Sequence, residues 1–147
     1  MDFGQSIKIC FSKYAVFSGR ASRSEFWFFY IFILIGYIIC FTLIMTISFN
    51  LFWLMVVFIL GMIVPAIAVT TRRLHDINKS GWFQFLPFPV GILERVAATS
   101  SESLEILFLI IGLVLYIYLF ILYCTDGDKK NNRFGKNIYV KTKKRKK

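Results

Sequence analysis

The sequence predicts an all-α membrane protein, a small bundle of about four transmembrane helices with an N-terminal amphipathic helix. Of its 147 residues, 57% are hydrophobic, which is more than a soluble domain of this size needs for one core. Long apolar runs alternate with short basic blocks, and the formal net charge is +10. This alternation is typical of a chain that crosses a membrane several times, because each crossing needs about 20 apolar residues.

A short amphipathic helix is predicted for residues 5–17. Lysines fall between apolar residues that recur at helical spacing, namely Ile7, Cys10, Phe11, Tyr14 and Phe17. Such a helix can lie on the membrane surface with its lysines against anionic lipid, or it can pack under the bundle as ordinary core. The residues favour neither alternative. The first 25 residues lack the apolar stretch of a signal peptide, so we expect the first span to be retained.

The next two apolar runs predict a helical hairpin. Ser22, with Glu25 three residues later, has the form of a capping box, so a helix should begin there. Residues 26–47 carry no charge over 22 positions, which is long enough to cross a hydrocarbon core of about 30 Å. Residues 51–69 form the second span, and Pro65 is tolerated there if a neighbouring group satisfies the carbonyl that proline leaves free.

The third apolar run, residues 82–93, is too short to cross a membrane as it stands. It contains two prolines and is followed by a glutamate and an arginine. Either the crossing extends to residue 98 with this charged pair reaching outward, or the segment is re-entrant. The last run, residues 104–124, is long enough to span.

The distribution of basic residues favours a full crossing by residues 82–98. In that case 17 of the 18 Lys and Arg residues share one side of the membrane, and the other side keeps only Arg95. Otherwise the ten basic residues of the C-terminal segment lie opposite the rest, against the excess of Lys and Arg in cytoplasmic segments. We therefore expect four crossings with the N- and C-termini in the cytoplasm.

We expect one membrane domain, residues 1–125, followed by a basic cytoplasmic tail, residues 126–147. The last seven residues hold six basic groups, which would lie against the anionic leaflet at roughly 1 kcal/mol each. No nucleic-acid partner is expected, since no accompanying nucleic-acid-binding domain is evident. Dispersed cysteines and a single histidine predict no disulfide, metal site or cofactor.

The candidate site is the sequence TTRRLHDINKSGW, residues 70–82, predicted as a cytoplasmic connection between the second and third spans. It can close the loop structurally, or it can bind an anionic headgroup or another phosphate through Arg72, Arg73, His75 and Lys79. A catalytic alternative uses His75 as the acid/base beside Asp76. Adjacent helical residues point about 100° apart and form a poor dyad, so we assign no catalytic residue.

A second polar motif, residues 17–27, should lie at the same membrane surface. There Glu25 could pair with Arg72 or Arg73, and Asp76 with Arg20 or Arg23. If the helix continues past residue 69, Arg72 could also meet Asp76 at i,i+4. Two tryptophans are expected as interface anchors, namely Trp27 and Trp82.

Three stretches together resemble one family. They are FSGRASRSEFW at 17–27, RRLHDINKSGW at 72–82 and NRFGKN at 132–137. In this order, and separated by apolar runs, they resemble the DUF805 family of YhaH-like small bacterial inner-membrane proteins. The resemblance covers nearly the whole chain and implies a multi-pass inner-membrane protein without an established activity or a catalytic assignment. Asn78 stands where the family often has glycine.

The predicted function is that of a non-enzymatic protein of the bacterial inner (plasma) membrane. Its cytoplasmic basic face would bind anionic lipid headgroups or a protein partner, which could be a second copy of the chain. A transporter or channel component is an alternative, which would need charged residues in mid-span. A membrane enzyme acting on lipid headgroups would need His75, Asp76 and Glu25 in one pocket.

Overall fold

The computed structural model describes residues 2–139, and within that range the chain is helical with no strand. The elements in order are α1 (Phe3–Ser12), α2 (Arg23–Thr46), η1 (Phe49–Leu51), α3 (Phe52–Asp76), η2 (Gly81–Phe85), α4 (Pro87–Ala97) and α5 (Glu102–Cys124). The predicted class, an all-α membrane protein with a short N-terminal helix before the spans, is confirmed. By length and composition, α2, α5 and α3 with η1 are each long and apolar enough to cross a membrane.

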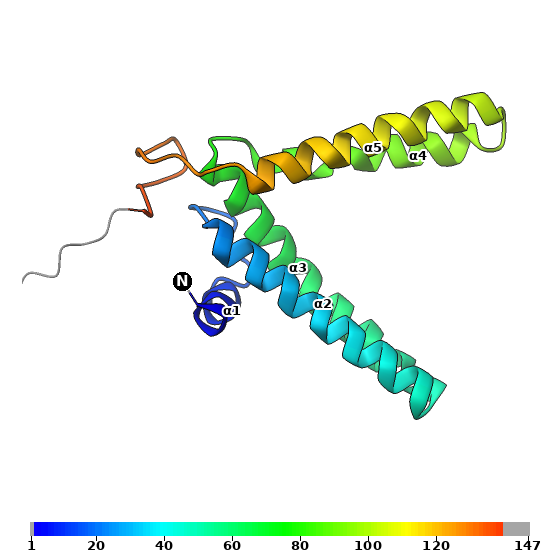
Figure 1. The fold of residues 1–147 in the computed structure, drawn as a ribbon, viewed down its shortest axis with the longest axis horizontal. Helices are drawn as coiled ribbons and strands as arrows, with labels where there is room; N and C mark the ends of the chain where they lie inside the picture. The colour runs from blue at the N-terminus through cyan, green and yellow to red at the C-terminus, as the bar shows by residue number, and fades with distance from the viewer. Residues whose placement is uncertain (1, 140–147) are drawn as a thin grey trace, which may run out of the picture.

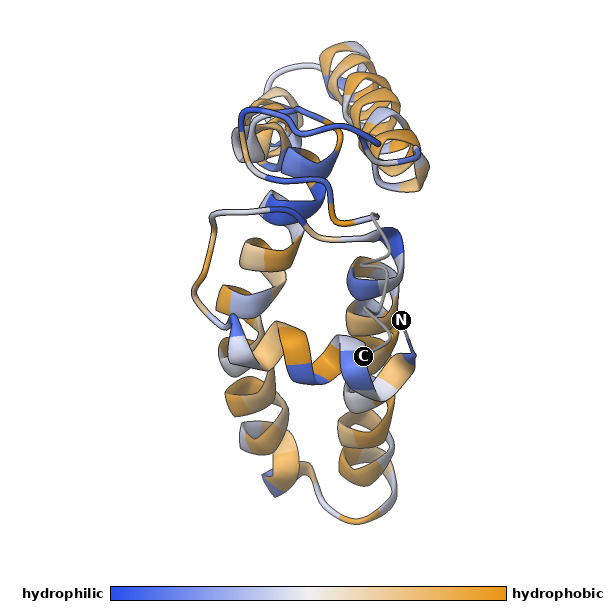
Figure 2. Ribbon diagram, turned by 90° about the vertical axis from the view of Figure 1, so that its left-hand side faces the viewer, coloured by the Kyte–Doolittle hydropathy of each residue, from blue (hydrophilic) through white to orange (hydrophobic). Residues whose placement is uncertain are grey.

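The long helices form two antiparallel hairpins that diverge from a common end. In Figure 1, α2 lies beside α3 and α4 lies beside α5, and the two pairs spread apart like the arms of a V. The tight turns of both hairpins lie at the far ends of the arms. Figure 2 shows that hydrophilic residues gather where the arms meet, while the helices themselves are mostly apolar. The polar junction is therefore the place to look for a site.

The third apolar run forms two consecutive helical pieces. The 3₁₀ helix η2 leads into α4, and α4 runs along α5 (Figure 1). Pro87 is the first residue of α4, where the missing N–H of proline costs no intrahelical hydrogen bond. Glu94 is half-buried and Arg95 is exposed at the far end of the arm. Together η2 and α4 extend over roughly 28 Å, from the rises of the two helix types.

Helix α1 lies across the first hairpin near the polar junction (Figure 2). It is shorter than the predicted segment 5–17 and starts earlier, because the Asp2 side chain caps it by accepting from the Gln5 N–H at 2.7 Å. Phe3 and Phe11 pack edge-on against rings of α2, while Lys8 is exposed. Of the two alternatives for this segment, the contacts match packing against the bundle.

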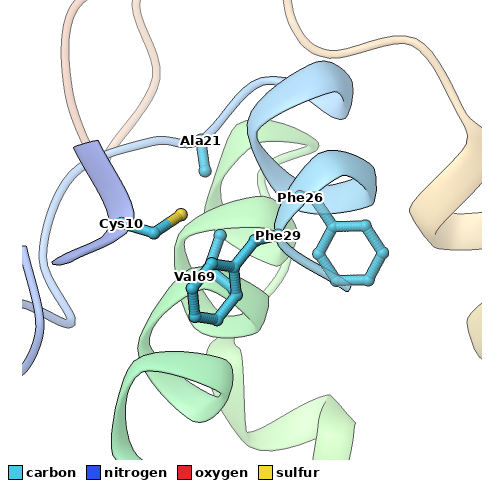
Figure 3. Close-up of a cluster of buried hydrophobic side chains, with 5 residues drawn as sticks. All are labelled: Cys10, Ala21, Phe26, Phe29 and Val69. Atoms are coloured by element: carbon cyan, nitrogen blue, oxygen red, sulfur yellow. The ribbon is translucent and has the colours of Figure 1, made fainter. Parts of the chain in front are cut away.

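The apolar centre of the junction joins α1, α2 and α3. Its buried members are Cys10, Ala21, Phe26, Phe29 and Val69. Figure 3 shows Cys10 on α1 directed toward Phe29 and Val69, while Phe26 points away from them. The Phe26 ring meets Tyr123 of α5 at 4.9 Å between centroids, so it connects the second arm to this core. The core thus fixes where the two hairpins meet.

Pro65 lies inside α3, and the helix continues through it to Asp76. Proline has no N–H, so the carbonyl of Gly61, four residues earlier, loses its usual intrahelical donor. The hydroxyl of Tyr14 donates to this carbonyl at 2.6 Å. A residue from the segment after α1 therefore satisfies the acceptor that proline leaves free, as the sequence requires for a tolerated proline.

This contact predicts that the effect of Tyr14→Phe depends on Pro65. In the natural chain the substitution leaves the Gly61 carbonyl without its donor and should lower the free energy of unfolding by about 1 kcal/mol. In a Pro65→Ala background the new N–H can donate instead, so the same substitution should cost much less. Thermal unfolding of the four proteins in one detergent measures the difference, and equal losses in both backgrounds would contradict the contact.

Helix α3 extends two turns beyond the predicted span, so residues 70–76 are helical and only the short segment after them is a loop. The helix ends at Asp76, and Asn78, two residues later, has a φ of 58° in the left-handed region. The N–H of Lys79 donates to the carbonyl of Leu74 at 2.9 Å, and that of Asn78 to His75 at 3.0 Å. This is a Schellman ending, in which asparagine takes the position usually held by glycine.

Candidate functional site

A cluster of charged side chains is buried at the junction of the arms. Each of its five members is at most 5% exposed, namely Arg20, Glu25, Arg72, Arg73 and Asp76. They come from the segment before α2, the first turn of α2 and the last turns of α3. Buried charges are costly unless they are paired and hydrogen-bonded, so their partners decide whether this is a structural core or a ligand site.

Asp76 is the centre of the larger group. Its Oδ1 accepts from Nε of Arg20 at 2.9 Å and lies 2.8 Å from Nη2 of the same side chain. Its Oδ2 accepts from Nη1 of Arg73 at 2.7 Å and from the hydroxyl of Tyr139 at 2.5 Å. One carboxylate therefore receives two guanidinium groups and a phenol, and both of its oxygens are occupied.

The two arginines of this group also hold the C-terminal segment. Arg20 donates to the carbonyl of Lys130 at 2.8 Å and to that of Asp128. Arg73 donates to the carbonyl of Tyr123 at 3.1 Å and to that of Thr125. The carbonyls at the end of α5 have no intrahelical donors and carry the negative end of the helix dipole. A guanidinium group stabilises them in two ways, because it donates hydrogen bonds and also brings a positive charge.

The segment after α5 packs directly on Asp76. The N–H of Asp128 donates to the Asp76 carbonyl at 2.9 Å. A Cβ atom at Gly127 would overlap the Asp76 carboxylate and the Tyr139 hydroxyl, so glycine is needed for this close approach. Burial, followed by the hydrogen bond to Asp76, raises the pKa of Tyr139 to about 12. The phenol therefore stays a hydrogen-bond donor throughout the physiological pH range.

Glu25 and Arg72 form a second buried pair that joins α2 to α3. Nη1 of Arg72 lies 2.8 Å from Oε1 of Glu25, but neither terminal nitrogen of Arg72 has a well-aligned acceptor within the described residues. Nε donates to the Ala68 carbonyl at 3.3 Å. Ser22 caps α2 by accepting from the Glu25 N–H at 3.2 Å, so only half of the capping box forms. The Glu25 carboxylate faces Arg72.

The sequence left two possible arginine partners open for each acid across the surface, and the structure contains one of the two in each case, together with a further pair between Arg73 and Asp76. Glu25 lies against Arg72, and Asp76 lies against Arg20 as well as Arg73. The pair at i,i+4 between Arg72 and Asp76 does not form, because Arg72 points to α2. Arg72 and Arg73 do not join His75 and Lys79 in an open pocket for a headgroup, since both guanidinium groups are buried against carboxylates or carbonyls.

His75 lies on the outer side of the buried cluster, in contact with the NRFGKN motif at residues 132–137. Its ring stacks on Phe134 with 3.8 Å between centroids, and the Arg133 guanidinium covers the Phe134 ring at 4.7 Å. Nδ1 of His75 lies 3.1 Å from the Gly19 carbonyl. Asn132 donates to the His75 carbonyl at 2.9 Å. His75 thus links the segments before α2 and after α5 to the end of α3.

The remaining candidates lie at the surface. The Arg23 side chain is 49% exposed; it forms an ion pair with Asp126 at 2.5 Å and donates to the Cys124 carbonyl at 3.1 Å. Lys79 lies over the Phe83 ring at 5.7 Å. Trp27 packs against Phe120 of α5, whereas Trp82 is 78% exposed and suits an interface position.

The buried Cys10 thiol provides a chemical test of the junction. Burial and then the neighbouring Glu25 carboxylate raise the pKa of this thiol to about 12. Because the thiolate is the reactive form, Cys10 should stay protonated and unreactive at pH 8 in the folded protein.

In a variant that keeps Cys10 as its single cysteine, maleimide labelling at pH 8 should be slow in detergent and fast in denaturing SDS. A variant that keeps only the exposed Cys124 is the matched control and should label in both conditions. Fast labelling of Cys10 in the folded protein would contradict the buried junction.

Sequence reasoning missed three contributors to this cluster. Gly127 lies in the sequence DGD, residues 126–128, at the start of the predicted tail. Tyr139 and Phe134 fall in the predicted tail, but they pack on Asp76 and His75. The NRFGKN motif was the one available signal for this docking. The basic residues 141–147 of the same tail lie outside the described residues.

The fold and the junction define an integral membrane protein with a buried ion-pair core at one end of its helices. The chain belongs to the DUF805 family of proteins of unknown function, whose family profile matches residues 14–136. It is similar to the inner membrane protein YhaI of Escherichia coli K12, with 27% identity over 123 residues, 84% of this chain and 86% of the relative. YhaI of Escherichia coli O157:H7 matches to the same extent. No solved structure matches the chain.

Proposed function

We propose that this protein is a non-enzymatic component of the bacterial inner membrane that binds anionic lipid headgroups through exposed basic side chains around the junction. The observation that carries the proposal is the separation of its positive charges. Arg20, Arg72 and Arg73 are used inside the fold, whereas Arg133 and the lysines of residues 8–13 and 129–136 are exposed. The buried cluster is the scaffold, and the exposed rim is the contact surface.

The proposed topology has four crossings, with the junction in the cytoplasm. Arg95 is the one basic residue of the described range that lies at the far end of the arms, and three glutamates accompany it there. Lys and Arg are enriched in cytoplasmic segments, so the junction is assigned to that side. The combined length of η2 and α4, and the packing of α4 along α5, support a full crossing by the third segment.

Single cysteines at Ser100 and Lys136 test this topology in a cysteine-free background. Four crossings require opposite sides, so an impermeant maleimide should label Ser100→Cys in cells with a permeable outer membrane. Lys136→Cys should label only after the inner membrane is opened. Both positions are exposed in the fold, so access through the membrane decides the result. Labelling of Lys136→Cys from outside together with protection of Ser100→Cys would instead indicate a re-entrant third segment.

The exposed rim consists of side chains from α1, from the residue that follows α1 and from the segment after α5. Its members are Lys8, Lys13, Lys129, Lys130, Arg133 and Lys136. Basic groups near an anionic leaflet contribute roughly 1 kcal/mol each, so several together produce a clear preference for anionic over zwitterionic lipid. A basic, polar rim of this kind complements the headgroup region of a membrane. It complements the apolar surface of a protein partner less well.

Lipid retained by the purified protein tests the proposal. After reconstitution in equal amounts of phosphatidylglycerol and phosphatidylethanolamine, native mass spectrometry should find the anionic lipid enriched. The combined change Lys129→Gln, Lys130→Gln and Lys136→Gln should reduce this enrichment by at least about fivefold. Arg95→Gln, at the opposite end, is the control and should leave the ratio unchanged. No enrichment in the natural protein, or equal enrichment in the triple variant, would refute the function.

The geometry gives less support to the two alternatives. Glu25 and His75 line different cavities, and Asp76 is fully enclosed by its partners, so the three do not share a pocket as a headgroup enzyme would need. In α2, α3 and α5 the charged side chains lie in the terminal turns. A transport path would be expected to place them in mid-span.

A further inference from the structure

A cavity of about 380 Å³ lies between the end of α3, the helix η2 and the segment before α2. This volume falls within the range of small-molecule sites. Its walls include Ile67, Thr71, His75, Ser80, Gln84 and Phe85. The cavity is separate from the exposed basic rim, so an inference about it does not depend on the proposed function.

The α3 wall of the cavity changes from apolar to polar along the helix. Ile67, Thr71 and His75 are spaced at i, i+4 and i+8, which places them on one face of α3. Along the axis of α3, Ile67 and His75 lie about 12 Å apart. Ile67 lies on the side of the apolar span, and His75 lies at the polar junction. This gradient matches a molecule that lies along α3 with an apolar body and a polar head.

The polar end of the cavity is set up to receive hydrogen-bond donors. A carbonyl can only accept, so Nδ1 of His75 carries the proton in its bond to Gly19, and in the neutral ring Nε2 is left as an acceptor. Nε2 of Gln84 donates to Thr71 at 2.8 Å and to the Gly81 carbonyl at 2.9 Å. Both amide hydrogens are then used, which leaves the Gln84 carbonyl oxygen to accept.

The absence of charged side chains in the cavity lining, within residues 2–139, limits the chemical class of the ligand. Among the described residues, no Lys, Arg, Asp or Glu lines this cavity. A phosphate would have no cation beside it and an ammonium group would have no carboxylate, so either charge would be desolvated without a partner. An uncharged hydroxyl group fits this lining, because it donates its one hydrogen to the acceptor of His75 or of Gln84 and its oxygen accepts from the hydroxyls of Thr71 and Ser80.

We propose that this cavity binds an uncharged lipid with a hydroxyl head, of the diacylglycerol class. The head hydroxyl lies among His75, Gln84 and Thr71, and the first part of an acyl chain lies along Ile67 and Phe85. The rest of the lipid remains in the bilayer beside the arms. Recognition depends on the hydroxyl hydrogen, so capping that oxygen or charging the head weakens binding.

Photo-crosslinking with the full-length protein in a bilayer tests the site. Three probes share the same diazirine-bearing chains and differ in the head: diacylglycerol, its O-methyl ether and phosphatidic acid. The diacylglycerol probe should label peptides from residues 60–85. The other two should label them at least about fivefold less, the effect of one lost hydrogen bond. Equal labelling by the three probes would overturn the proposal without any substitution being made.

Substitutions locate the site. Ile67→Phe fills the apolar end of the cavity and should reduce labelling about as much as removal of the head hydroxyl. Leu60→Phe is the matched control; it adds the same ring to an exposed position of α3 and should leave labelling unchanged. Undiminished labelling of a folded Ile67→Phe protein would refute this cavity as the site. Competition by free glycerol would place the ligand in the aqueous phase and overturn the assignment to a lipid.

Discussion

Asp76→Asn is expected to lower the free energy of unfolding by about 3–5 kcal/mol. The carboxylate is fully buried and is the one counter-charge shared by two guanidinium groups, those of Arg20 and Arg73. An asparagine side chain keeps the shape, but it supplies one acceptor where two are used and leaves two buried cations without a counter-charge. Breaking a buried ion pair from one side costs far more than losing an exposed pair, because the remaining charge cannot reach water.

Thermal unfolding in a fixed detergent measures this loss. Asp126→Asn is the matched control, since Asp126 also pairs with an arginine at the junction but is 73% exposed. Its loss should be within about 1 kcal/mol, as for other surface ion pairs. Similar stabilities of the two variants would show that Asp76 does not hold the junction together.

The pair formed by Glu25 and Arg72 should show strong coupling. Glu25→Leu leaves the Arg72 guanidinium buried alone, and Arg72→Met leaves the Glu25 carboxylate buried alone, so each change should cost about 3–5 kcal/mol. Replacing both charges by apolar groups of similar size removes the desolvation cost as well as the attraction. The double variant should therefore be more stable than either single variant.

A double-mutant cycle measures this coupling, with the same thermal unfolding as the observable. The exchange Glu25→Arg with Arg72→Glu offers a second test, in which partial rescue of the single variants supports direct pairing. Glu25→Leu combined with Asp126→Asn is the control, because these acids have different partners. Additive losses for Glu25→Leu and Arg72→Met would contradict the pair.

The choice of ion-pair partner for each arginine depended on the tertiary arrangement of the helices. The sequence placed both acids and four arginines at one membrane surface, which limited the possible partners to a few. Arg72 and Arg73 are adjacent in a helix and point about 100° apart, so they cannot serve the same neighbour. The packing of α2 on one side of α3 and of the C-terminal segment on another assigns Arg72 to Glu25 and Arg73 to Asp76.

The segment after α5 was the least predictable part of the junction. Its composition is that of a solvated basic tail, and its local sequence favours turns over a regular element. Residues 126–139 nevertheless return to α3, because Gly127 allows a close approach to Asp76 and Phe134 stacks on His75. These are contacts over more than 50 positions in sequence, and no local periodicity reports them.

By itself, the sequence determined the class of protein, the order of its spans and the polar surface where its motifs gather. Uncharged runs long enough to cross a bilayer and short basic blocks between them are local properties, so composition and spacing were sufficient. The tertiary structure alone decided which charges are buried and which stay exposed. Burial depends on how helices distant in sequence rotate and pack against one another. Here it encloses three arginines with two acids and leaves exposed the lysines of residues 8–13 and 129–136.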